Sequence, residues 1–175
     1  MKKLLIVFLF LFVAFPYYAM GAIITGVTSS STPSSNIAPL AAVTASSENS
    51  SSGQLAIKAI DGVIDGYPGD YTKEWATSGG GAGSWLQLDW SVSYTVDKVI
   101  LYDRPNLNDN ILSATLSFSD GSTLTVGPLD NAGAGTEYTF SPKVITSLRM
   151  TVNTVSGGTQ NIGLAEIEVY GTSST

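Results

Sequence analysis

Hydrophobic and polar residues alternate with a period of two along most of the chain between residues 36 and 172. The clearest example is Ser113–Ser119, where Ala114, Leu116 and Phe118 fall on one face and the intervening serine and threonine residues fall on the other. Side chains of a β-strand point alternately to opposite faces, so this spacing predicts a strand with one buried face. No comparable stretch has helical spacing, except a short one around residues 54–60.

A tight turn follows this strand directly. Glycine accepts a positive φ angle, so the dipeptide Asp120-Gly121 predicts a hairpin leading to a partner strand that carries Leu124 and Val126. Residues 96–102 are more continuously apolar, as expected of a central strand. The same alternation recurs at Tyr138, Phe140, Leu148, Met150, Val152, Ala165, Ile167 and Val169. About eight short strands predict an all-β fold, an antiparallel β-sandwich of the jelly-roll type, with Trp85, Trp90, Tyr138 and Phe140 in its core.

The first 21 residues have the composition of a secretory signal peptide. Lys2 and Lys3 precede the apolar run 4–15, and Ala19-Met20-Gly21, with small residues at its first and third positions, predicts a cleavage site after Gly21. The run is shorter than the ~20 apolar residues that a membrane-spanning helix needs. An uncleaved anchor that also uses residues 16–22 is the alternative.

The mature chain divides into a short lead-in and one domain. Residues 22–35 are rich in serine and threonine, which predicts a linker, although the apolar residues 22–24 would also suit a lead-in edge strand. The sandwich is expected over residues 36–172, followed by a short tail at 173–175. This organisation predicts a secreted protein, either extracellular or held at the cell surface.

Composition excludes several classes of function. The chain has no cysteine and no histidine, so it has no disulfide framework, no thiolate zinc site and no ordinary general base near neutral pH. Its net charge is −6, and it becomes −8 once Lys2 and Lys3 are removed, with 6 basic against 14 acidic side chains. No basic footprint for nucleic acid remains. We therefore expect neither catalysis nor nucleic-acid binding.

A polar loop after the central strand is a candidate ligand site. Residues 102–110 contain one arginine, three asparagines and two aspartates, among them Arg104, Asn106, Asn108 and Asp109. Guanidinium and amide groups supply the directed donors and acceptors that recognise vicinal hydroxyls. The alternative is a structural loop in which Arg104 pairs with Asp103 or Asp109. The candidate stacking platforms are Tyr67, Tyr71 and Trp75, and the loops 78–84 and 156–161 are further candidate contributors.

A second cluster is acidic. Residues 61–75 carry Asp61, Asp65 and Asp70 in a glycine-rich loop, with Thr72 and Glu74 close behind. Calcium takes carboxylate and carbonyl oxygens and needs neither sulfur nor imidazole, which suits this composition. The alternative is that these are ordinary solvated turn residues, as most aspartates before glycine are.

The order of motifs resembles the discoidin family, which includes the C-type domains of coagulation factors five and eight and the family 32 carbohydrate-binding modules. The motifs that carry the resemblance are NIAPLAAVTASSE (36–48), KAIDG (58–62), WLQLDW (85–90), VDKVILYDRPN (96–106) and GLAEIEVYG (163–171). The resemblance implies a galactose-binding-like sandwich without catalysis that binds sugars, or in some branches phospholipid headgroups or proteins, through loops at one end.

The resemblance also implies roles for particular residues. Arg104 and Asn108 match the positions that contact sugar in relatives. Asp61, Thr72 and Glu166, with Asp65 as a fourth, match those that hold a structural calcium ion. Two departures stand out: the metal loop is longer than in relatives, and the histidine often found in galactose sites is absent, so galactose itself is not assumed.

The sequence therefore predicts a non-catalytic, lectin-like module whose partner is a carbohydrate or glycoconjugate. The alternative is an extracellular adhesion or assembly protein that binds surface proteins through the same sandwich. Membrane contact is not expected apart from the signal segment, because the 103–110 loop offers only Arg104 and Leu107 to a bilayer.

Overall fold

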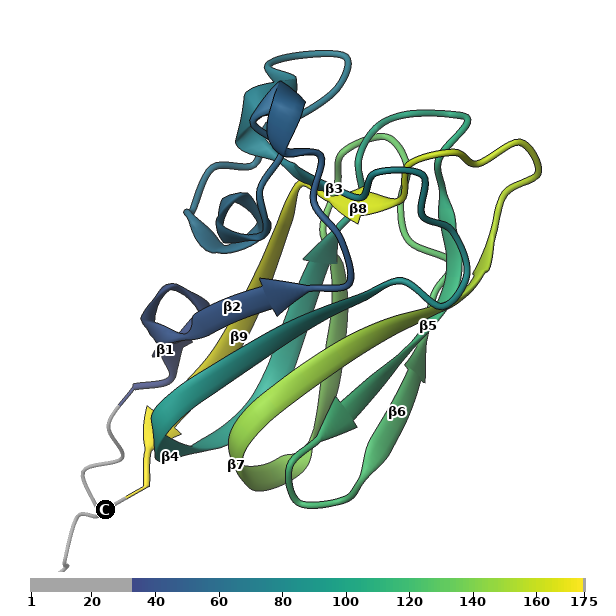
Figure 1. Cartoon of the computed structure of the whole chain (residues 1–175). Coiled ribbons are helices and arrows are strands. Elements are labelled where there is room, and N and C mark those ends of the chain that lie inside the picture. Colours follow the sequence, from purple (N-terminus) through teal and green to yellow (C-terminus); the bar gives the residue numbers. More distant parts are fainter. Residues whose placement is uncertain (1–32, 175) are drawn as a thin grey trace, which may run out of the picture. The chain divides into compact units, whose positions relative to one another are not determined.

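A computed structural model describes residues 33–174, and within them the regular structure is β-strand and short 3₁₀ turns (Figure 1). The strands are β1 Ser35–Asn36, β2 Ala42–Ala45, β3 Trp75–Ala76, β4 Trp85–Tyr102, β5 Ile111–Phe118, β6 Thr123–Val126, β7 Thr136–Val155, β8 Gly163–Leu164 and β9 Glu166–Ser173. The 3₁₀ turns are η1 Ala38–Leu40, η2 Ser50–Ser52, η3 Ala56–Ile60 and η4 Tyr71–Lys73. The prediction of an all-β fold is confirmed, and the one expected helical stretch forms η3.

Two long strands build both layers of an antiparallel sandwich. The strand order is β1-β9-β4-β7-β5-β6, with β2 added to β4. The register of β4 with β7 shifts between Asp89 and Tyr94, which divides both strands into two halves. The first half of β4 lies with β2 and the second half of β7, next to β5 and β6. The second half of β4 lies with β9 and the first half of β7.

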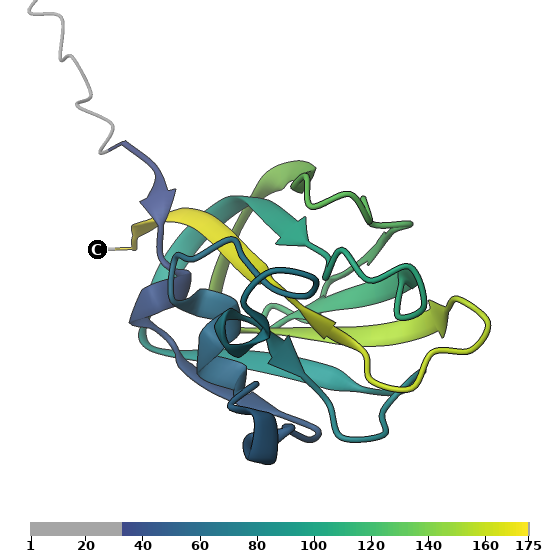
Figure 2. The ribbon, with the colours of Figure 1, turned by 90° about the horizontal axis from the view of Figure 1, so that it is seen from above.

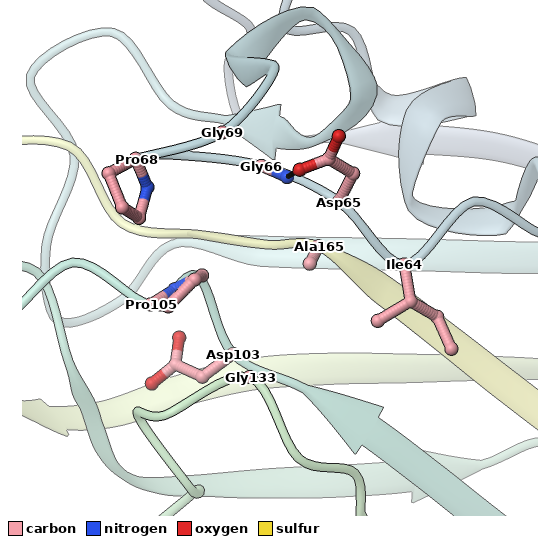
Figure 3. A pocket seen from close by; sticks show the side chains of 9 residues that line it. All are labelled: Ile64, Asp65, Gly66, Pro68, Gly69, Asp103, Pro105, Gly133 and Ala165. Carbon is pink, nitrogen blue, oxygen red and sulfur yellow. Dashed lines mark hydrogen bonds between the residues drawn. The ribbon is translucent and has the colours of Figure 1, made fainter.

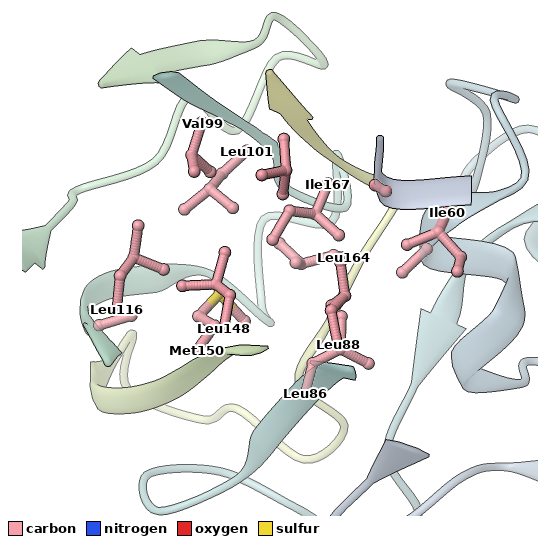
Figure 4. Close-up of a cluster of buried hydrophobic side chains, with 14 of the residues drawn as sticks. Ile60, Leu86, Leu88, Val99, Leu101, Leu116, Leu148, Met150, Leu164 and Ile167 are labelled. Atoms are coloured by element: carbon pink, nitrogen blue, oxygen red, sulfur yellow. The ribbon is translucent and has the colours of Figure 1, made fainter. Parts of the chain in front are cut away.

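The core lies between these layers. Leu86 and Leu88 from the first half of β4 face Val99 and Leu101 from its second half, and all four are fully buried (Figure 4). Leu116, Leu148, Met150, Leu164 and Ile167 fill the same space. The alternation in β5 therefore has the origin that the sequence indicated, one face on the core and one on solvent, and the continuously apolar residues 96–102 lie in β4 between β7 and β9, as expected of a central strand.

The predicted hairpin is confirmed in register as well as in position. Ser117 pairs with Thr123 across the turn. Gly121 has a φ angle of 86°, a conformation that residues with a side chain rarely adopt. Phe118 is buried and Leu124 packs against the core. The turn residues therefore predicted the pairing of β5 with β6 correctly from the local sequence alone.

The tryptophans differ from the expectation. Trp75 is fully buried, and its indole N–H donates to the Ser47 carbonyl at 3.0 Å. Trp90 is in the core as predicted. Trp85 is not: it lies half-buried on the outer face, with the guanidinium of Arg149 4.3 Å from its ring centroid. The indole of Trp85 is therefore available to solvent, and that of Trp75 is not.

The two ends of the described chain lie side by side (Figure 2). Ser35 pairs with Gly171, and β9 continues to Ser173, so the sandwich extends one residue beyond the expected domain at each end. The predicted signal segment 1–21 and most of the lead-in lie outside the described residues. Among residues 33–174 no helix is long and apolar enough to cross a membrane.

Candidate functional site

Three loops meet at one end of the sandwich. They are residues 61–74 before β3, residues 103–110 between β4 and β5, and residues 156–162 between β7 and β8 (Figure 1). The last two lie side by side because Ile111, which follows the second loop, pairs with Val155, which precedes the third, and the backbone N–H of Ser156 donates to the Asn110 carbonyl at 3.0 Å. The first loop reaches the others through Glu74.

Glu74 is fully buried and joins the first loop to the second. Its Oε1 atom lies 2.8 Å from Nε of Arg104 and accepts a hydrogen bond from Gln54 Nε2 at 2.6 Å. Its Oε2 atom accepts from the backbone N–H of Tyr67 at 2.8 Å. Burial raises the pKa of Glu74, and the positive charge of Arg104 opposes that rise. An added Cβ at Gly66 would lie 2.3 Å from Oε2, so only glycine lets the loop approach this closely.

Arg104 joins the second loop to the third. It is only 4% exposed, and its Nη1 atom donates to the Asn161 carbonyl and lies 3.6 Å from Asp109 Oδ2. Asp109 in turn accepts from the backbone N–H groups of Gln160 and Asn161, at 2.9 and 3.3 Å. The three loops therefore share one buried polar network.

This network gives structural partners to three residues that were predicted to contact the ligand. Arg104 was predicted to contact the ligand, but its Nε and Nη1 atoms lie against protein oxygens, as the structural alternative had it, with Glu74 as an additional partner that the alternative lacked. Asp109 is buried. Asn106 donates to Asp109 at 2.8 Å and accepts from the backbone N–H of Asn108 at 3.1 Å. All three hold the loops in place.

A polar hollow of ≈ 440 Å³ opens above the network. It is lined by Tyr67, Asn106, Asn108, Asp109, Gly158, Gln160 and Asn161. Tyr67 is 48% exposed. Asn108 and Gln160 are exposed. Within residues 33–174, only the main-chain N–H and carbonyl groups of these two residues form hydrogen bonds, and their side-chain amides form none. Their side-chain amides are therefore free to bind a ligand beside the tyrosine ring.

The predicted site residues divide accordingly. Four of the predicted ligand contacts line the hollow, namely Tyr67, Asn106, Asn108 and Asp109. Tyr71 is half exposed but lies on η4 and is not among the lining residues, and Trp75 belongs to the core. Gln160 was predicted only as part of the candidate loop 156–161. The sequence feature that could have pointed to it is the pair of adjacent side-chain amides, Gln160 and Asn161, shortly after the long strand β7.

A smaller hollow of ≈ 150 Å³ adjoins the first. Its lining consists of Ile64, Asp65, Gly66, Pro68, Gly69, Asp103, Pro105, Gly133 and Ala165 (Figure 3). The chain segments 66–68 and 105–106 contribute to both hollows, so these segments form the ridge between them. Asp103 is fully buried and accepts from the backbone N–H groups of Arg104 and Ile111, at 2.9 and 3.0 Å. Burial raises the pKa of Asp103 to about 7.

The structure brings together two of the four residues expected to hold calcium. Glu166 is fully buried, and its Oε1 atom accepts from the backbone N–H of Gly62, next to Asp61, at 3.2 Å. Its Oε2 atom has no hydrogen-bond partner. Burial, together with the nearby charge of Asp61, raises the pKa of Glu166 to about 8, although the hydrogen bond from Gly62 opposes the rise. A buried carboxylate oxygen without a donor, beside a second carboxylate, is chemistry that fits a hard cation.

Asp65 and Thr72 have other partners. Asp65 Oδ1 accepts from the backbone N–H groups of Gly66 and Asp70, and the hydroxyl of Thr72 donates to Asp70 at 2.6 Å. No group of three or more acidic side chains within residues 33–174 is arranged to hold a metal ion. Any ion between Asp61 and Glu166 would therefore take its remaining ligands from carbonyl groups or water.

Comparison with known proteins supports the fold. A family model described as a domain of unknown function, DUF7402, matches residues 36–170. Among curated proteins, none matches the chain in sequence. The family 32 module from C. perfringens NanJ, solved with galactose, is 21% identical with a TM-score of 0.61, over 78% of this chain and 98% of that one.

Two further solved structures are similar over the same region. A fucose-binding module from Streptococcus pneumoniae is 20% identical with a TM-score of 0.64, over 78% of this chain and 97% of that one. A chitosan-binding module from a Paenibacillus chitosanase/glucanase is 27% identical with a TM-score of 0.60, over 78% and 98%. These structures show that the sandwich has the galactose-binding-like, discoidin-type fold that the motifs indicated.

Proposed function

We propose that this chain, which belongs to the DUF7402 family of domains of unknown function, is a secreted module that binds carbohydrate through the hollow above its buried polar network. One observation carries the proposal. The side-chain amides of Asn108 and Gln160 have no hydrogen-bond partner within residues 33–174 and line a hollow that also holds the half-exposed ring of Tyr67. An amide offers a donor and an acceptor together, which suits adjacent sugar hydroxyls, and an aromatic ring packs against the C–H face of a pyranose.

The network beneath the hollow supports this use. A shallow polar site binds weakly unless its groups are held in place before the ligand arrives, because ordering loops costs free energy. Here Glu74 holds the backbone of Tyr67, while Asp109 holds that of Gln160. The contacts that fix the site are therefore distinct from the groups that meet the ligand.

The surroundings of the hollow favour binding without catalysis. A glycosidase places an acid and a base on opposite sides of the scissile bond. The carboxylates nearest this hollow, Asp109 and Glu74, are both buried and both occupied by protein donors. The similar structures include modules that bind galactose, fucose and chitosan, which supports a sugar as the ligand here.

A calcium ion held by Asp61 and Glu166 is part of the proposal, with a structural role. It would neutralise the buried Glu166 carboxylate and tie the 61–66 loop to β9. The ion would therefore support the loop that carries Tyr67 and would not touch the sugar.

The test is a titration of the chain with a panel of oligosaccharides, followed by calorimetry or by NMR shifts. We expect a Kd of about 0.1–1 mM for one class, which is roughly −4 to −5.5 kcal/mol. Asn108→Ala and Gln160→Ala should each weaken binding about tenfold, since each removes a donor and an acceptor. Asn153→Ala is the matched control, because Asn153 is an exposed amide on β7 outside both hollows. Equal binding by all three variants would contradict the assigned site.

A further inference from the structure

We infer that the site selects sugars by charge: it accepts uncharged and amine-bearing sugars and excludes those that carry carboxylate or sulfate groups. This inference rests on the proposed function and names the ligand class of the same site. It follows from where the positive charges of the domain are placed and from what lines the two hollows.

The arginine of the site is not available to an anion. Arg104 lies between two carboxylates, 2.8 Å from Glu74 and 3.6 Å from Asp109, and it is only 4% exposed. One positive and two negative charges leave the buried cluster with a net charge of −1. An anionic sugar in the hollow would thus meet a net negative charge from below.

Among residues 33–174, no lysine or arginine lines either hollow. Aspartates do: Asp109 in the larger hollow, and Asp65 in the smaller one, together with Asp103, whose pKa of about 7 leaves it only partly ionised at neutral pH. The remaining basic side chains of residues 33–174 have neighbours elsewhere: Lys58 at Asp61, Lys73 at Asp70, Lys98 at Glu137, Lys143 at Phe118 and Arg149 at Trp85. The site is consequently acidic on both sides of its ridge.

This distribution decides between ligand classes. A carboxylate or sulfate that loses water on binding needs a cation or several donors in exchange, and here it would face like charge. Like unit charges about 4 Å apart in water already weaken binding about fivefold, and more where water is excluded. An ammonium group at the same distance from a carboxylate binds more tightly by the same factor. The smaller hollow, with Asp65 and the partly ionised Asp103 among apolar walls from Ile64, Pro68 and Ala165, suits a small group such as an amine, which as an ammonium is attracted to the charge of Asp65 and can donate a hydrogen bond to either form of Asp103.

The experiment compares glycans matched in length: neutral hexose oligomers, glucosamine oligomers and uronate oligomers, each titrated at low salt and at 0.5 M NaCl. We expect the uronates to bind at least fivefold more weakly than the neutral oligomers and the glucosamine oligomers to bind at least as well as these. High salt should narrow these differences, because it screens exposed charges. Tighter binding of uronates would overturn the inference, whereas absence of binding by every class would overturn the proposed function.

A paired substitution tests the electrostatic cause. Leu107→Lys adds a cation next to Asn108 without removing any lining residue, since Leu107 is 82% exposed. Val144→Lys adds the same charge at another exposed position, outside both hollows. Uronate binding should rise at least about threefold in the first variant and stay unchanged in the second. Equal behaviour of the two variants would show that charge at this site does not select the ligand.

Discussion

Replacing Arg104 by methionine should destabilise the domain strongly, because it removes the only positive charge between two buried carboxylates. Glu74 would keep its bonds from Gln54 and Tyr67 but lose its ion pair, and Asp109 would lose its nearby guanidinium. Removing one partner of a buried pair typically costs 3–5 kcal/mol. For a domain of this size, that loss lowers the melting temperature by about 10–15 °C.

Thermal and urea unfolding followed by circular dichroism measure the loss. Arg149→Met is the matched control, because this guanidinium lies exposed over Trp85 and its removal should cost less than about 1 kcal/mol. Adding Glu74→Gln to Arg104→Met should recover part of the stability, since a neutral amide tolerates burial better than an unpaired carboxylate. A loss below about 1 kcal/mol for Arg104→Met would refute the reasoning.

Three other predictions follow from buried groups. Calcium at 100 times its Kd should stabilise the domain by about 2.7 kcal/mol and Glu166→Gln should remove most of that gain, as differential scanning calorimetry would show; an equal shift in the variant would exclude this site. The folded-state pKa of Asp103 is about 7, above the ordinary value of 3.8, so the native state retains a proton that the unfolded state loses. The free energy of unfolding should therefore fall as pH rises from 4 to 7, and urea titrations of Asp103→Asn should show a flatter profile unless other groups cause the fall. Trp75→Ala should cost about 3–5 kcal/mol and Trp85→Ala much less, and the reverse order would place the core on the other face.

The sequence by itself determined the strands and the turns. The period of two in Ser113–Ser119 separates a core face from a solvent face, and the dipeptide Asp120-Gly121 admits a tight turn. These are local properties, because side-chain alternation and glycine φ angles depend only on neighbours along the chain. The order of short motifs then identified the fold, since each motif lies on a strand or turn that the sandwich retains.

Only the tertiary structure decided which face of each strand is buried when both faces carry large side chains. Trp85 alternates with Leu86 and Leu88, and the leucines, not the tryptophan, face the core. Trp75 stands in a strand of two residues, too short for any periodicity, and is buried because β3 pairs with β8.

The same limit applies to the candidate site. Arg104 lies in a loop of polar residues, the composition of an exposed site, and the burial of its guanidinium depends on Glu74, which is 30 residues away along the chain. No local pattern along the chain specifies this contact, because it forms only when the folded sandwich brings the 61–74 and 103–110 loops together. The role of each charged residue was thus set by its tertiary neighbours, whereas the chemistry available to it was already present in the sequence.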